Sequence, residues 1–84
     1  MEKFIQKLTR LLRKHFPGGE LDWGPRRDRL AGFLIWSGFV GREQIERQRA
    51  VRKVLMAELT PEEQQRVAAI LTLTPDEMAA AREG

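Results

Sequence analysis

The chain contains no cysteine and no long hydrophobic run. Without cysteine it can form no disulfide, no thiolate metal site and no thiol nucleophile, so packing alone must hold the fold. A membrane span needs about 18 consecutive apolar residues, and no such run occurs. The first residues, MEKFIQKLTRLL, mix charges with apolar positions and include no small-residue cleavage site, which argues against a secretory signal. We therefore expect a cytoplasmic protein with no membrane association.

Groupings of residues that mark an enzyme are also missing. We find no nucleophile beside a base, no pair of carboxylates with a shared site and no phosphate loop of the Walker type. The only histidine, His15, falls in the last turn of a predicted helix. A histidine there usually serves as a charge or packing partner rather than as a metal ligand or acid-base group. We expect no catalytic activity, no metal and no cofactor.

Charge is present and unevenly distributed. With 84 residues, 42% of them hydrophobic and 32% charged, the chain has the size and composition of one small domain spanning residues 1–84. Residues 1–19 carry five basic side chains and one acidic, whereas residues 58–84 carry two basic and six acidic. A basic face can attract nucleic acid or an acidic protein. Alternatively, the acidic end can lie against the basic helices of the same chain.

Periodicity and alternation predict the first half of the fold. Apolar residues recur every three or four positions in residues 2–16, the pattern of an amphipathic helix. A short strand is predicted over residues 20–23 and ended by Gly24-Pro25, followed by a charged loop over residues 26–29. The run AGFLIW, residues 31–36, is apolar on both faces and predicts an interior strand. Together the two strands suggest a hairpin with a charged tip.

One long helix is predicted within residues 37–59, the stretch SGFVGREQIERQRAVRKVLMAEL. The residues expected in its buried stripe are Ile45, Val51, Val54, Leu55 and Leu59. The residues expected on its outer face are Arg42, Glu46, Arg49 and Lys53. Glu43 and Arg47 are spaced to form an ion pair along the helix. The outer face fits either a binding surface or an ordinary solvated helix.

The segment Gly38-Phe39-Val40-Gly41 has the G-x-x-G spacing of a KH nucleic-acid module, whose loop clamps a phosphate backbone. If the long helix starts at this motif, backbone amides and arginines are presented together at a helix start, where anions are favoured. A tight turn between a strand and a helix explains both glycines without a ligand. The motif is therefore consistent with either role.

Two further helix starts and a strand complete the predicted order. Thr60-Pro61-Glu62-Glu63 and Thr74-Pro75-Asp76-Glu77 both place a capping threonine before a proline, with a glutamate three residues after the threonine. Between them, residues 66–73 form an apolar run of strand length. The helical crossover between the second and third strands is long enough to make that pair parallel. We predict an α+β fold with a mixed three-stranded sheet packed with helices.

Four segments in register resemble the BolA family. They are FPGGEL (Phe16 to Leu21), GFVG with Phe39 and Gly41 matching an F-x-G, ERQRAV (Glu46 to Val51) and TLTPDEM (Thr72 to Met78). The family carries F-x-G, R-H-R/Q-x-V and T-P-E-E-W motifs at similar intervals, and the resemblance covers nearly the whole chain. It implies a class II KH-like fold with the order αββααβ.

The resemblance implies a non-enzymatic regulator or adaptor, associated with transcriptional control, the stress response and monothiol glutaredoxins. In the family, a glutaredoxin cysteine, glutathione and BolA side chains share an iron-sulfur cluster. The family's ligating histidine falls on Gln48, and its second ligand, a histidine or cysteine, should fall in residues 25–30, where neither occurs. An amide is a poor iron ligand beside imidazole or thiolate. We therefore expect that this chain does not ligate the cluster.

Two functions follow as hypotheses. In the first, a basic helix-turn-helix-like face binds nucleic acid, DNA in preference to RNA, or an acidic partner. The candidate contact residues are Gly38, Gly41, Arg42, Arg47, Gln48, Arg49, Arg52, Lys53, Arg26 and Arg27. In the second, the chain pairs with a monothiol glutaredoxin without supplying a ligand. Trp23 and Trp36 could stack on bases, although core packing is the commoner role of such residues. We expect a monomer or a weak dimer.

Overall fold

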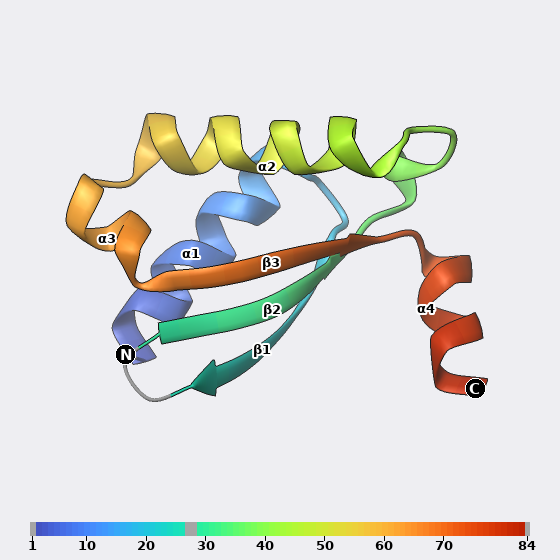
Figure 1. Cartoon of the computed structure of the whole chain (residues 1–84), viewed down its shortest axis with the longest axis horizontal. Helices are drawn as coiled ribbons and strands as arrows, with labels where there is room; N and C mark the ends of the chain where they lie inside the picture. The colour runs from blue at the N-terminus through green and yellow to red at the C-terminus, as the bar shows by residue number, and fades with distance from the viewer. Residues whose placement is uncertain (1, 27–28, 84) are drawn as a thin grey trace.

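The structure is a computed structural model that describes residues 2–26 and 29–83. Its elements are α1 (Glu2–His15), β1 (Glu20–Arg26), β2 (Arg29–Ile35), the 3-10 helix η1 (Ser37–Phe39), α2 (Gln44–Glu58), α3 (Pro61–Gln65), β3 (Val67–Leu73) and α4 (Pro75–Glu83) (Figure 1). This order matches the predicted one, with η1 as an addition. No helix within the described ranges has the length and hydrophobicity to cross a membrane.

The three strands form one mixed sheet in the order β1-β2-β3. β1 and β2 pair antiparallel, with Asp22 opposite Phe33. β2 and β3 pair parallel, with Phe33 opposite Leu71, and their register shifts between Leu30 and Ala31. The central position of β2 agrees with the apolar run that predicted an interior strand. The predicted α+β fold with a mixed three-stranded sheet is confirmed.

The core lies on one face of this sheet. Figure 1 shows α1 behind the sheet and α2 running along the side on which β3 lies. The buried core residues are Phe4, Leu8, Leu11, Leu12, Phe16, Leu30, Leu34, Phe39, Val51, Leu59 and Ile70. Because side chains alternate along a strand, the residues between Leu30 and Leu34 that point the other way lie on the opposite face. There Phe33 keeps 37% of its surface exposed.

Both β1 and β2 are longer than predicted. β1 does not end at Gly24-Pro25 but continues through it to Arg26, and β2 already begins at Arg29. β1 is an edge strand, where proline is tolerated because its missing N–H can lie on the side away from the neighbouring strand. Arg26 and Arg29, both predicted in the charged loop, therefore belong to the strands, and positions 27 and 28 lie outside the described residues.

The long helix predicted within residues 37–59 is interrupted. η1 ends at Phe39, Gly41 adopts a φ of +82°, and α2 begins only at Gln44. Ile45 is 56% exposed, so its predicted place in the buried stripe is wrong. Ile45 and Val51 are six residues apart, and at about 100° per residue they lie about 120° apart around the helix. The other four members of the predicted stripe are buried or half-buried.

Both predicted helix starts are confirmed. Thr60 Oγ1 accepts a hydrogen bond from the backbone N–H of Glu63, and the Glu63 carboxylate accepts one from the backbone N–H of Thr60. The same reciprocal pair joins Thr74 and Glu77. Each pair satisfies two backbone donors that a helix start would otherwise leave without a partner.

Acidic side chains of the second half also pair with the basic helices. Glu63 Oε2 lies 2.7 Å from Lys7 Nζ on α1, and Glu77 Oε1 lies 2.7 Å from Arg47 Nη1 on α2. For these two pairs, the alternative in which the acidic end lies against the basic helices is confirmed.

The Glu77 pair gives the stability a pH dependence. The hydrogen bond from Arg47, followed by that from the backbone N–H of Thr74, lowers the pKa of Glu77 below its ordinary value. Such a group contributes stability above its unfolded-state pKa, and the contribution is lost as the pH falls through the folded-state pKa. We expect Glu77→Gln to lower the free energy of unfolding in urea at pH 7, and to lower it less at an acidic pH at which the native carboxyl is also protonated. An equal loss at both pH values would contradict this assignment.

Candidate binding groove

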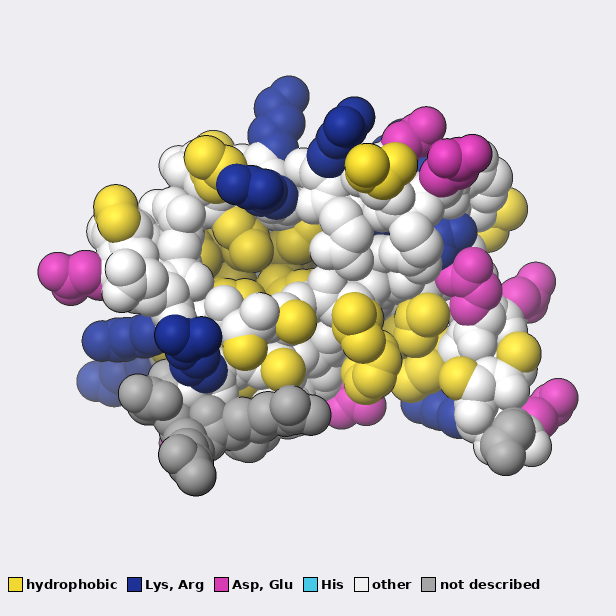
Figure 2. All heavy atoms as spheres, viewed as in Figure 1, with side chains coloured by type: hydrophobic (Ala, Val, Ile, Leu, Met, Phe, Trp, Pro, Cys, Tyr) yellow, Lys and Arg dark blue, Asp and Glu magenta, His cyan; other side chains and the backbone are white. Residues whose placement is uncertain are grey.

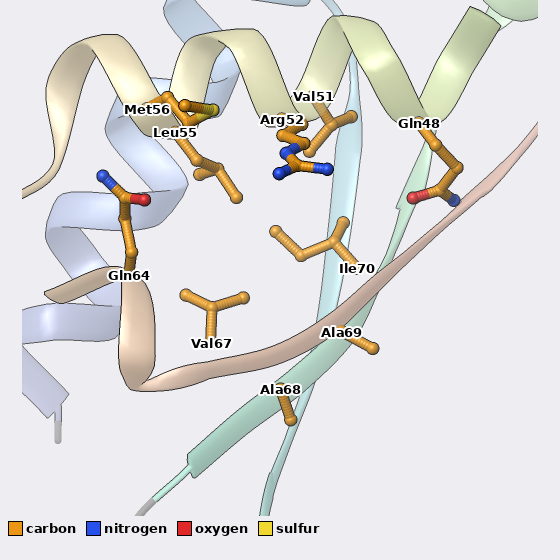
Figure 3. Close-up of a pocket in the computed structure, with 10 residues that line it drawn as sticks. All are labelled: Gln48, Val51, Arg52, Leu55, Met56, Gln64, Val67, Ala68, Ala69 and Ile70. Atoms are coloured by element: carbon orange, nitrogen blue, oxygen red, sulfur yellow. The ribbon is translucent and has the colours of Figure 1, made fainter. Parts of the chain in front are cut away.

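A groove of about 480 Å³ lies between α2 and β3. Its lining residues are Gln48, Val51, Arg52, Leu55 and Met56 from α2, Gln64 from α3, and Val67, Ala68, Ala69 and Ile70 from β3 (Figure 3). Figure 3 shows Val67 and Ile70 directed from β3 toward α2, while Ala68 and Ala69 point away from it. The floor is therefore formed by branched apolar side chains, and the polar residues stand around it.

Hydrogen bonds hold α2 against β3 at one end of the groove. Thr72 Oγ1 donates to Gln44 Oε1 at 2.7 Å, and Gln44 Nε2 donates to the backbone carbonyl of Thr72 at 2.9 Å. Gln48 Nε2 lies 3.3 Å from Thr72 Oγ1. At the other end, Gln64 Nε2 donates to the Leu59 carbonyl and fixes the start of α3. The groove opens between these two fixed ends.

Three basic residues are exposed on α2, and one of them lines the groove. Arg52 lines the groove itself, and Arg49 and Lys53 are exposed on the same helix. We call Arg49, Arg52 and Lys53 the basic rim. No residue of the basic rim takes part in a salt bridge within the part of the chain that the structure describes. Figure 2 shows basic side chains along α2 above a hollow with a hydrophobic floor.

Arg47, predicted as a contact residue, is instead part of the core. Only 6% of its surface is exposed, its Nε donates to the Arg42 carbonyl, and its Nη1 donates to Glu77 Oε1. Its guanidinium carbon lies 5.8 Å from the centre of the Phe39 ring. The expected pairing with Glu43 is therefore replaced by the pair with Glu77. Arg42 itself remains exposed but precedes α2.

The glycines of the G-x-x-G motif have structural explanations. A Cβ at Gly38 would come within 2.5 Å of the Trp36 ring, and Gly41 adopts a left-handed φ of +82°. The helix does not begin at the motif, because Glu43 occupies the N-cap of α2. An acidic side chain thus stands at the helix start where an anion was expected. The predicted anion site at this motif is not formed, and the tight-turn alternative accounts for both glycines.

The remaining candidates lie away from the groove. Trp23 Nε1 donates to Thr9 Oγ1, and Trp36 packs edge-on against Phe39 with its Nε1 bonded to the Pro17 carbonyl. Both tryptophans are half-buried and pack against the core, in agreement with the commoner role. Arg26 ends β1, and Arg27 lies outside the described residues.

His15 also lies away from the groove, with its Nε2 3.7 Å from Glu58 Oε2. In the described ranges, no three His, Asp or Glu side chains come close enough together to hold a metal ion.

The fold was compared with known proteins. Neither a family model nor a curated protein matches the sequence. Among solved structures, BolA1 from Arabidopsis thaliana superposes with a TM-score of 0.67 at 20% identity, covering 88% of this chain and 94% of that one. The chain has a BolA-like fold. A bol-like protein from Babesia bovis also matches, with a TM-score of 0.60 at 19% identity and coverage of 92% of this chain and 91% of that one.

The BolA-like fold confirms the architecture that the four sequence segments implied. Gln48, at the position that the resemblance assigns to the family's histidine, lines the groove beside β3. Sequence reasoning found Gln48, Arg49, Arg52 and Lys53, but it missed the floor and Gln64. A signal for the floor was present, because Val67 and Ile70 belong to the apolar run that predicted β3.

Proposed function

We propose that this chain with a BolA-like fold is a non-enzymatic regulator or adaptor that binds nucleic acid through the groove between α2 and β3. The observation that carries the proposal is the basic rim beside an apolar floor. Arginine and lysine side chains that face solvent without a carboxylate partner are available to phosphates. A cytoplasmic role in transcriptional control or the stress response would be consistent with the family resemblance.

The floor favours a single strand over a duplex. Bases in a duplex are stacked and expose only their edges, whereas the bases of a single strand can present their faces to apolar side chains. Val51 and Ile70 are almost fully buried at the bottom of the groove, so the half-buried Leu55 and Val67 and the exposed Met56 offer such a surface. The amides of Gln48 and Gln64 stand at its sides, where base edges would reach them. The volume of about 480 Å³ lies within the usual range for ligand sites.

The dependence of binding on salt tests this proposal. A fluorescent single-stranded DNA is titrated with the protein at several salt concentrations, and anisotropy gives the affinity. If the three residues of the basic rim each contact a phosphate of a single strand, the logarithm of the binding constant should fall with the logarithm of the salt concentration with a slope of about −2. Single-stranded RNA of the same sequence is the comparison, and we expect it to bind less tightly. A peptide nucleic acid of the same bases has no charged backbone and should bind weakly with no salt dependence. Equal binding of that uncharged analogue would contradict a phosphate-based site.

A second candidate is an adaptor for a monothiol glutaredoxin. It is favoured by the location of Gln48, which places the position of the family's iron-ligating histidine in an open groove. Gln48 Nε2 already lies within hydrogen-bond distance of Thr72 Oγ1, and a neutral amide is a weak ligand for iron. The partner would then bind this surface without a ligand from this chain.

The visible absorbance of a glutaredoxin-bound iron-sulfur cluster tests this second candidate. We expect the chain to bind the apo glutaredoxin and to leave the visible spectrum of a cluster-loaded glutaredoxin unchanged. Gln48→His, which restores an imidazole at the same position, serves as the positive control and is expected to change the spectrum. A change caused by the unaltered chain would show that another of its side chains ligates iron.

A further inference from the structure

The face of the sheet opposite α1 carries apolar side chains that no described helix covers over the middle of the strands. Phe33 is 37% exposed and Leu71 is 51% exposed. A shallow cavity of about 310 Å³ lies between them and Ala31 and Ala69. Figure 2 looks onto this face and shows hydrophobic side chains gathered in the middle of the sheet. We call this surface the open face.

Strand register arranges the open face in two adjoining rows of different size. Gly24, Ala31 and Ala69 pair across the three strands and form a row of small residues. One step along the strands, Asp22, Phe33 and Leu71 pair in the same way and form a row with two large side chains. The open face therefore consists of a hollow beside a ridge.

We propose that the open face is a self-association surface that binds a second copy of this chain. The two copies would be related by a twofold axis that lies between the sheets, perpendicular to the strands, and passes between the two rows. This rotation reverses the strand direction, so the row of small residues of each copy lies over the row of large residues of the other. Phe33 and Leu71 then enter the hollow at Ala31 and Ala69 of the second copy, as side chains interdigitate between packed sheets.

Charges at the two ends of the open face agree with this orientation. By strand alternation, Arg29 lies on this face beyond the row of small residues, and Glu20, opposite Ile35, lies beyond the row of large residues. The same rotation brings Arg29 of one copy near Glu20 of the other. A twofold axis parallel to the strands would instead place large residues on large residues and Arg29 near Arg29. The pattern of size and charge thus selects one arrangement of two identical surfaces.

The small area of the open face limits the strength of self-association. Strands of seven residues at about 3.3 Å each, in three strands about 4.8 Å apart, give a face of roughly 23 by 14 Å. This is less than half of the roughly 800 Å² that each partner contributes to a standard interface. A weak dimer is therefore expected, with a dissociation constant on the order of 10–100 μM.

Analytical ultracentrifugation of the full chain tests the proposal. Between about 5 μM and 1 mM, the average mass should rise from 9.7 kDa toward twice that value. Leu71→Lys should weaken association at least tenfold, because it places a charge in the ridge. Ile45→Lys makes the same type of change at a residue that is 56% exposed on α2 and should leave association unchanged. A chain that remains monomeric at 1 mM would overturn the proposal.

A second variant tests whether the complementary shape of the open face, and not only its hydrophobic area, drives self-association. Ala69→Leu adds exposed apolar area but fills the hollow that Leu71 of the second copy must enter. A nonspecific hydrophobic patch would then associate more strongly, whereas the proposed arrangement predicts association at least several-fold weaker. Circular dichroism of each variant checks that the fold is retained. Stronger association of Ala69→Leu would overturn the arrangement.

Discussion

Reversing the charge of Arg49 and Lys53 together, as Arg49→Glu with Lys53→Glu, is expected to weaken binding of single-stranded DNA more than tenfold at physiological salt. Each lost phosphate contact removes about 0.7 from the log-log salt slope, which at 0.15 M salt corresponds to about fourfold in affinity. Two lost contacts and the repulsion between the new carboxylates and the phosphates give the larger combined effect. Anisotropy titrations at several salt concentrations measure both the affinity and the slope.

A control double substitution tests whether the basic rim, rather than the net charge of the chain, determines the affinity for DNA. Arg10→Glu with Arg13→Glu changes the total charge by the same amount but acts on exposed residues of α1, which lies behind the sheet (Figure 1). We expect this pair to change the affinity less than about threefold, since charges beyond about 8 Å of the bound strand are largely screened at this ionic strength. An equal loss in both pairs would mean that net charge alone attracts the oligonucleotide.

Phe39→Ala is expected to lower the free energy of unfolding by about 3–5 kcal/mol. Phe39 is fully buried, and its ring centre lies 5.1 Å from that of Trp36 and 5.7 Å from that of Phe16. The alanine would leave a cavity in this cluster and remove the ring over which the Arg47 guanidinium lies. Domains of this size have a total stability of only about 5–10 kcal/mol, so much of the variant would be unfolded near 37 °C.

The neighbouring residue provides the control for this substitution. Val40 is 67% exposed, and Val40→Ala should change the free energy of unfolding by less than about 0.5 kcal/mol. Urea unfolding followed by tryptophan fluorescence measures both variants, and Trp36 reports directly on the cluster. A loss below about 1 kcal/mol for Phe39→Ala would mean that the aromatic cluster does not hold η1 against the core.

The sequence predicted those elements whose signals are local. The capping pairs of Thr60 with Glu63 and Thr74 with Glu77 need only residues three apart, and the structure forms both. The interior position of β2 followed from an uninterrupted apolar run. By contrast, the continuation of β1 through Pro25 depends on its place at the sheet edge, which only the tertiary arrangement determines.

The candidate site was predictable only in part for the same reason. Arg49, Arg52 and Lys53 were identified because a basic helix face is visible in the sequence. Arg47 belongs to the same cluster of arginines, yet it is buried because α4 brings Glu77 to it from 30 residues away. The groove itself lies between the hydrogen bonds that join Thr72 to α2 and the hydrogen bond from Gln64 at the start of α3, which join residues of different elements. No pattern within a single element contains that information.

Nuclear magnetic resonance with the full chain and a short single-stranded DNA tests the central claim most directly. As the oligonucleotide is added, the backbone amide signals of Gln48, Arg52, Gln64 and Ile70 should shift together and saturate, while those of Arg10 and Arg13 on α1 stay in place. Shifts that spare the groove and fall on α1 or on the open face, or no shifts at all, would contradict the assignment of the groove between α2 and β3 as the nucleic-acid site.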